Sequence, residues 1–163
     1  MKICKNNNKL LCLSIDSNSY TTLYTDAVDT VDEAVKTLLG REANDGEGLT
    51  VSVTNENDRP RIEFSNEDPQ DKYFVSAEVF PMPTKDFIVV YWHAYDGVGF
   101  DIIGSSDSLD EARKILHDYV QENIVDIPED YREGDASITA DNGNEWEMLQ
   151  ILRYNNNDIK EVA

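Results

Sequence analysis

The sequence is short of basic residues compared with acidic ones. Its 163 residues include 14 Lys and Arg against 33 Asp and Glu, which gives a formal net charge of −19. The imbalance is larger in residues 83–163, with 18 acids and 6 bases, than in residues 1–82, with 15 and 8. Such a charge opposes binding to nucleic acids and anionic membranes, so we expect neither as a direct partner. The natural complement is a basic macromolecule.

Cysteine and histidine are also scarce. Cys4 and Cys12 lack the partner residues of a zinc site or of a disulfide scaffold, so we expect reduced thiols, with Cys12 buried in a strand. His93 and His117 are not spaced for a metal site or for a nucleophile–base pair. We therefore expect no metal, no cofactor and no catalytic residue, and we interpret the chain as a binding protein rather than an enzyme.

Long apolar runs are missing. No segment approaches the roughly 18 apolar residues of a membrane-spanning helix, and the first residues do not form a credible signal peptide. The apolar fraction of 40% is nevertheless typical of a globular chain that can bury a core. These features predict a cytoplasmic protein, of bacterial or phage type.

A repeat becomes visible when the chain is compared with itself at an offset of 78 residues. Thr30-Val31-Asp32-Glu33 aligns with Ser108-Leu109-Asp110-Glu111, and both have the pattern of a capping box at a helix start. The first helix is expected to end at Gly40 and to bury Val31, Ala34, Val35, Leu38 and Leu39. The second helix is expected to bury Leu109, Ala112, Ile115, Leu116, Tyr119 and Val120.

Matching hairpins flank both predicted helices. Residues 10–15 align with 88–93 before the helices; after them, at an offset of 86, residues 49–54 align with 135–140. The predicted fold is therefore α+β, an internal duplication of a ββαββ unit, with two amphipathic helices packed on antiparallel sheet. The expected boundaries are 1–65 and 87–154 for the two units, 66–86 for a connecting segment with an extra strand, and 155–163 for a flexible tail. We expect both units to form one compact domain.

Acidic residues concentrate around an eight-residue insertion that follows the second predicted helix. They lie in the insertion itself and on the approach to the helix: Asp126, Glu129, Asp130, Glu133 and Asp135, and Asp101, Asp107 and Asp110. One interpretation is a charge that serves solubility. The other is that the carboxylates stand where phosphates would and engage a nuclease, a nucleic-acid-binding protein or a toxin. In composition alone, the chain resembles DNA-mimic inhibitors of phage and mobile elements and acidic immunity proteins.

Aromatic residues gather in the hairpin that opens the second unit. Trp92 and Tyr95 are candidates for a partner-binding patch, although packing in the sheet explains them as well. The alternative function is a structural or accessory protein of a phage or mobile element that forms a homodimer through this hairpin.

Two ligand motifs are rejected. Asp141-Asn142-Gly143-Asn144-Glu145 resembles the start of a calcium loop, but the glutamate that an EF-hand needs at position twelve is absent, and the same residues suit a hairpin turn. Gly97-Val98-Gly99 lacks the third glycine and the helix start of a dinucleotide loop.

Overall fold

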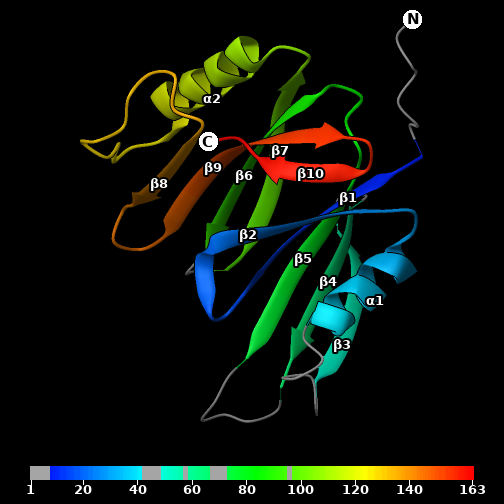
Figure 1. Ribbon diagram of the computed structural model, residues 1–163. Helices are drawn as coiled ribbons and strands as arrows, with labels where there is room; N and C mark the ends of the chain where they lie inside the picture. Colours follow the sequence, from blue (N-terminus) through cyan, green and yellow to red (C-terminus); the bar gives the residue numbers. More distant parts are fainter. Residues whose placement is uncertain (1–7, 42–48, 57–58, 67–72, 95–96) are drawn as a thin grey trace, which may run out of the picture. The chain divides into compact units, whose positions relative to one another are not determined.

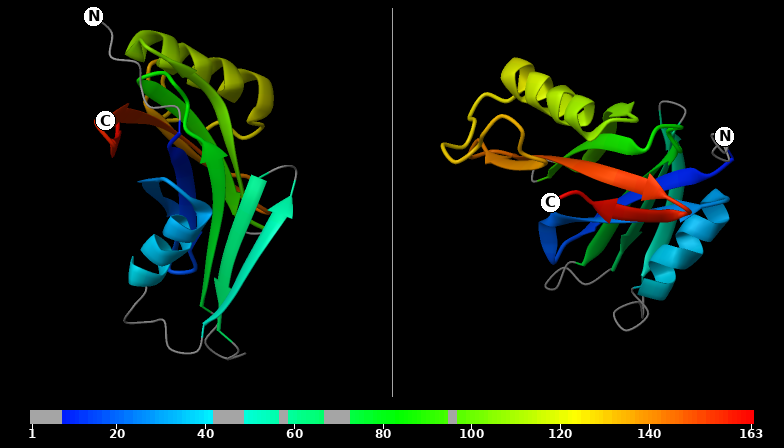
Figure 2. Two further views of the ribbon diagram at one scale, coloured as in Figure 1. Left: turned by 90° about the vertical axis from the view of Figure 1, so that its right-hand side faces the viewer. Right: turned by 45° about the horizontal axis from the view of Figure 1, so that its top comes forward.

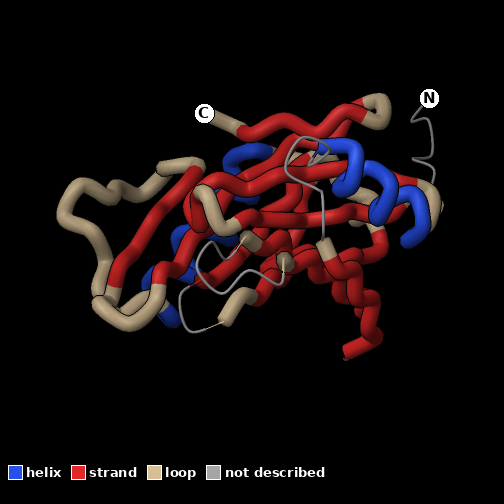
Figure 3. The backbone as a smooth tube through the Cα atoms, turned by 90° about the horizontal axis from the view of Figure 1, so that it is seen from below, coloured by secondary structure: helices blue, strands red, loops and turns tan. Residues whose placement is uncertain are grey.

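The computed structural model describes residues 8–41, 49–56, 59–66, 73–94 and 97–163. The chain divides into two compact units, Met1–Met82 and Pro83–Ala163. Within the described residues, each unit has one antiparallel sheet and one helix, and strands make up most of the chain (Figures 1 and 3). The predicted α+β class with antiparallel sheet is therefore confirmed.

The first unit is built on a five-stranded sheet of order β2-β1-β5-β4-β3. Its strands are β1 (Leu10–Asp16), β2 (Ser19–Val28), β3 (Thr50–Glu56), β4 (Arg59–Ser65) and β5 (Phe74–Pro81). The strand expected inside the connecting segment 66–86 is β5, and it is the central strand of this sheet. It pairs with β1 on one side and with β4 on the other.

Helix α1 (Val31–Arg41) begins where the capping residues predict. Thr30 Oγ1 accepts a hydrogen bond from the Glu33 amide at 3.1 Å, and Glu33 Oε2 accepts one from the Asp29 amide at 2.6 Å. Ala34 and Leu38 are buried in a cluster with residues of β1, β2, β4 and β5. Two expectations are wrong: Leu39 is 37% exposed, and the helix continues through Gly40.

The second unit has β6 (Phe87–Ala94) between β7 (Gly99–Ser106) and β9 (Trp146–Asn155). The other edge of β9 pairs with β8 (Ser137–Asp141) and then with β10 (Asp158–Glu161). In the first unit β5 separates β1 from β4, whereas here β6 pairs directly with β9. The two units thus share the order of their ββαββ elements but differ in sheet pairing.

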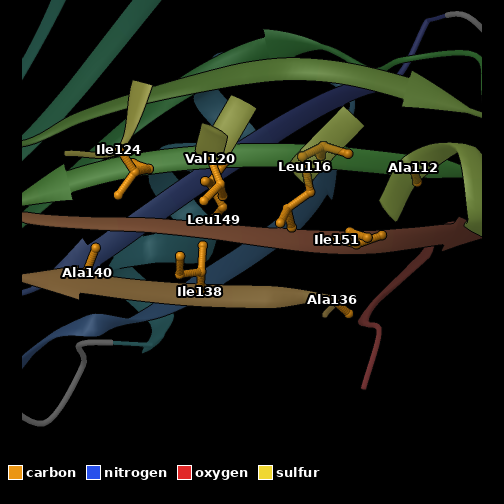
Figure 4. Close-up of a cluster of buried hydrophobic side chains, with 10 residues drawn as sticks. Ala112, Leu116, Val120, Ile124, Ala136, Ile138, Ala140, Leu149 and Ile151 are labelled. Atoms are coloured by element: carbon orange, nitrogen blue, oxygen red, sulfur yellow. The ribbon is translucent and has the colours of Figure 1, made fainter. Parts of the chain in front are cut away.

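Helix α2 (Leu109–Asn123) begins at Ser108, whose side chain accepts a hydrogen bond from the Glu111 amide. Its apolar side chains point toward β8 and β9, as Figure 4 shows for Leu116 and Val120 above Leu149. They form a buried cluster with residues of β6, β8 and β9: Val89, Ala112, Leu116, Val120, Ile124, Ala136, Ile138, Ala140, Leu149 and Ile151. Within the described residues, neither helix is long and apolar enough to cross a membrane.

The segment 155–163, expected to be a flexible tail, contains β10. Asn156 and Asn157 have φ angles of 51° and 63° and close a tight hairpin between β9 and β10. Beyond the strand, the Val162 amide donates to the Ile151 carbonyl at 2.9 Å. The end of the chain is thus hydrogen-bonded to the sheet of the second unit (Figure 2, red).

Candidate functional site

The acidic insertion lies between α2 and β8, and its two ends are anchored in the core. Ile124 and Ala136 are 5% and 8% exposed, and the Ala136 carbonyl accepts a hydrogen bond from the Ile151 amide at 2.9 Å. Between these anchors, Asp126, Glu129 and Asp130 are exposed. We call residues 125–135 the acidic loop.

Hydrogen bonds within the acidic loop define its path. The Tyr131 amide donates to the Pro128 carbonyl at 3.1 Å, and the Arg132 guanidinium donates to the Glu129 and Tyr131 carbonyls at 2.6 and 2.8 Å. Asp135 Oδ2 accepts from the Arg132 amide at 2.8 Å, so this carboxylate caps a turn. The Arg132 guanidinium is thus hydrogen-bonded to the backbone of the loop itself.

Tyr131 joins the acidic loop to α2. Its hydroxyl lies 2.9 Å from Nδ1 of His117, and the two rings are stacked with centroids 5.9 Å apart. Burial, followed by the charges of Asp135 and Glu133, raises the pKa of Tyr131. A neutral phenol is retained at physiological pH, so this contact keeps the loop against the helix. Sequence reasoning missed the pair because 14 residues separate its members.

Two shallow hollows border the acidic loop. One, of about 260 Å³, lies beside β8 and is lined by Pro128, Asp130, Tyr131, Asp135, Ser137, Ile138 and Thr139. The other, of about 310 Å³, is lined by Asp110, Arg113, Lys114, Glu133 and Gly134. The second hollow brings the predicted residues Asp110 and Glu133 together, but it adds two basic side chains that sequence reasoning did not include.

Three of the remaining predicted residues belong to other segments of the second unit. Asp101 is exposed on β7, and its Oδ1 accepts a hydrogen bond from the Ile102 amide at 2.9 Å. Asp107 forms a salt bridge with Lys85 at 3.3 Å. Trp92 is 4% exposed, so it lies in the core rather than on an open surface. Tyr95 lies outside the described residues.

A second polar cluster, missed by sequence reasoning, lies on the sheet of the second unit. The Tyr91 hydroxyl donates to Glu147 Oε1 at 3.0 Å, and the Tyr91 and Tyr119 rings lie 5.5 Å apart. Next to Tyr91, the His93 imidazole contacts the Glu145 carboxylate. Strand alternation predicted that Tyr91 and His93 share a face, but not which residues of β9 and α2 meet them.

Tyr91 in this cluster should make the protein less stable at alkaline pH. Burial, and then the charge of Glu147, raises the pKa of Tyr91 above its ordinary value of about 10. An unfolded tyrosine ionises near that value while the folded one stays protonated, so the free energy of unfolding should decrease as pH rises above about 10. We expect Tyr91→Phe to reduce this decrease in denaturant titrations at increasing pH. An identical decrease in the variant would contradict the assignment.

Gly99 provides a test of the packing around His93. A methyl group at Gly99 would overlap the His93 imidazole, so we expect Gly99→Ala to destabilise the protein by about 1–3 kcal/mol. Gly40, in α1, has nothing within 4 Å of an added methyl group, and Gly40→Ala should stabilise by about 0.5–1 kcal/mol. Thermal unfolding of both variants measures the difference. Equal shifts would mean that His93 moves away freely.

The rejected calcium motif is a hairpin turn. Asp141 Oδ1 accepts from the Gly143 amide at 2.8 Å, and Asn142 Oδ1 accepts from the Asn144 and Glu145 amides at 3.0 and 2.8 Å. Gly143 has a φ angle of 87°, which glycine adopts readily. Across the described part of the chain, no group of three or more His, Cys, Asp or Glu residues is arranged to hold a metal ion.

Cys12 is not a reactive thiol in the folded chain. It is fully buried in β1, and burial together with the charge of Asp26 raises the pKa of its thiol to about 12. Because the thiolate is the nucleophilic form, this side chain is inert at neutral pH. The expected burial of Cys12 in a strand is confirmed.

Comparisons with known proteins add no family to this description. No protein-family model, no curated protein and no solved structure matches the chain.

Proposed function

We propose that this chain is a small acidic binding protein that neutralises a basic macromolecule. The partner is a nuclease, a nucleic-acid-binding protein or a toxin, and the chain acts as an inhibitor or immunity factor by placing carboxylates where nucleic-acid phosphates would bind. It binds without catalysis and without a cofactor, in the cytoplasm of a bacterium or an infected host cell.

One observation carries this proposal: the acidic loop presents four carboxylates that form no ion pair with a base in the described part of the chain. Among the described residues, Asp126, Glu129, Asp130 and Glu133 make no salt bridge. Arg132, the base within the loop, donates to carbonyl oxygens instead. Uncompensated like charges on one loop oppose folding, and a cationic partner would remove that repulsion.

Other described acids of the chain are paired with bases, as three ion pairs of the first unit show. Asp26 pairs with Arg41 at 2.7 Å, and Glu78 pairs with Arg61 at 2.9 Å. Lys9 lies 2.7 Å from Asp29. Ion pairs also occur in the second unit, such as Lys85 with Asp107, so the acidic loop differs from both units in its unpaired acids. An acidity that served solubility alone would not require unpaired acids to gather on one hydrogen-bonded loop.

We also infer that the two units arose by internal duplication of a ββαββ segment. The inference rests on the shared element order and on the matching Thr30 and Ser108 helix caps. The different pairing of β1 and β6 would then reflect the insertion of β5 into the first sheet after duplication.

Capture from a lysate of the source cells tests the binding proposal. The immobilised chain should retain one dominant basic protein at low salt and release it at high salt, because screening beyond about 8 Å weakens attraction between exposed charges at physiological ionic strength. Mass spectrometry then identifies the partner. Beads that retain nothing, or a partner that salt does not release, would contradict the proposal.

A further inference from the structure

Among the strands that the structure describes, β3 forms an outer edge of the first sheet. In the order β2-β1-β5-β4-β3 it is the last strand, and it pairs with β4 from Thr50 to Glu56. Val51 and Val53 are 41% and 51% exposed, although their cross-strand partners Phe64 and Ile62 are completely buried. The apolar face of the sheet therefore continues onto β3 beyond the part that the core covers.

Most of this edge strand is uncharged. Charged side chains on an edge strand discourage pairing with another chain, and every outer strand contains at least one acid. These are Asp26 on β2, Glu56 on β3, Asp101 on β7, Asp141 on β8, and Asp158 and Glu161 on β10, and in β3 the acid is the last residue. In β3 the residues 50–55, Thr-Val-Ser-Val-Thr-Asn, contain neither charge nor proline.

We propose that β3 is a self-association edge, on which the β3 strand of a second copy pairs in antiparallel orientation about a two-fold axis at Ser52. This proposal is independent of the basic partner proposed above, because β3 belongs to the first unit and the acidic loop to the second. The two sheets would join into one continuous sheet across the axis.

Charge favours a second copy as the occupant. Each copy carries a net charge of −19, so two copies can approach closely only where both surfaces are locally uncharged. Residues 50–55 of the seam are uncharged, and the carboxylate of Glu63 beside them on β4 is paired with Arg61 at 2.7 Å, whereas a basic partner is attracted to the carboxylates elsewhere. When residues 50–54 of β3 meet the same residues of a second copy, no like charges lie opposite each other.

The sequence of β3 is self-complementary in this register. With Ser52 opposite its own copy, Val51 faces Val53 and Thr50 faces Thr54 of the second copy, and the reverse pairs follow by symmetry. Directly opposite residues of an antiparallel pair lie on the same face, so the four valines form one apolar row. Pairs of β-branched residues and of threonines are favourable across strands.

Salt distinguishes this contact from binding of a basic partner. A single strand pair buries little surface, so the dimer should be weak and appear only at high protein concentration. Because repulsion between two acidic copies opposes it, added salt should strengthen the dimer. Added salt should weaken capture of a basic protein, so failure of one proposal can be distinguished from failure of the other.

Sedimentation equilibrium of the full chain tests the proposal. From roughly 10 µM to 1 mM protein the average mass should rise toward that of a dimer, and more so at about 500 mM than at about 20 mM NaCl. Val53→Lys should stay monomeric. Val125→Lys is the matched control, since Val125 is 86% exposed in the acidic loop, and it should dimerise like the wild type. A wild type that stays monomeric, or a Val53→Lys variant that dimerises equally, would overturn the proposal.

Cysteine cross-linking tests the register. In a Cys4→Ser background, Ser52→Cys should form a disulfide-linked dimer under mild oxidation, because the two-fold axis brings this residue against its own copy. Thr54→Cys is the control and should cross-link much less, since Thr54 faces Thr50. Equal cross-linking at both positions would reject a fixed antiparallel seam.

Discussion

Reversing the four unpaired carboxylates of the acidic loop should weaken binding of the captured basic partner by about 100-fold or more. The variant Asp126→Lys, Glu129→Lys, Asp130→Lys, Glu133→Lys replaces attraction by repulsion at each site. If each exposed contact contributes up to about 1 kcal/mol, four reversals exceed the roughly 3 kcal/mol that corresponds to 100-fold. Isothermal titration with the purified partner measures the change.

A second variant with the same charge separates the loop from the overall acidity. Asp118→Lys, Glu122→Lys, Asp158→Lys, Glu161→Lys reverses four exposed acids on α2 and β10. Each variant has a net charge of −11, because four reversals remove eight negative charges from −19. The loop variant should lose binding while the control loses much less, and both should keep the wild-type melting temperature. Equal losses would assign binding to net charge rather than to the loop.

Leu38→Ala should destabilise the protein by about 2–5 kcal/mol, because the leucine side chain is 1% exposed and its removal leaves a cavity. The neighbouring Leu39 is 37% exposed on the same helix, and Leu39→Ala should cost less than about 1 kcal/mol. The two variants make the same chemical change at adjacent positions of α1. Urea unfolding of both gives the comparison directly.

The pair also tests the position of α1 on its sheet. A large loss for Leu39→Ala together with a small loss for Leu38→Ala would mean that the helix is rotated, with Leu39 in the core. Similar losses would contradict the division between the buried cluster of Ala34 and Leu38 and the exposed face of the helix.

Local signals were sufficient to predict much of the fold. The hydroxyl and glutamate of each capping box lie three residues apart, so the start of each helix depends on neighbours in sequence. The hairpin at Asp141 also follows from residues that bond to one another within the turn. Such features can be recognised without knowing the rest of the chain.

Pairing between distant segments was not predictable in the same way. The pattern of β5 shows that it is a strand, but nothing within it indicates that it separates β1 from β4. The burial of Leu38 rather than Leu39 depends on where α1 meets its sheet, since both positions fit an apolar stripe. For β10, the Asn156-Asn157 pair was a turn signal that sequence reasoning did not use.

In the candidate site, too, local features were predictable from the sequence and contacts between distant residues were not. Sequence reasoning located the acidic loop, because an insertion rich in carboxylates is visible in the residues themselves. The contact between Tyr131 and His117 and the approach of Glu133 to Asp110 were not visible, since each joins residues that only the fold brings together.

The affinity of the wild-type chain for its captured partner, measured as a function of salt, tests the central claim most directly. If exposed carboxylates bind a basic protein, the affinity should decrease at least about tenfold between roughly 50 and 300 mM NaCl, mainly through slower association. An affinity that stays constant or increases with salt would contradict binding through the acidic loop and would point to an apolar contact instead.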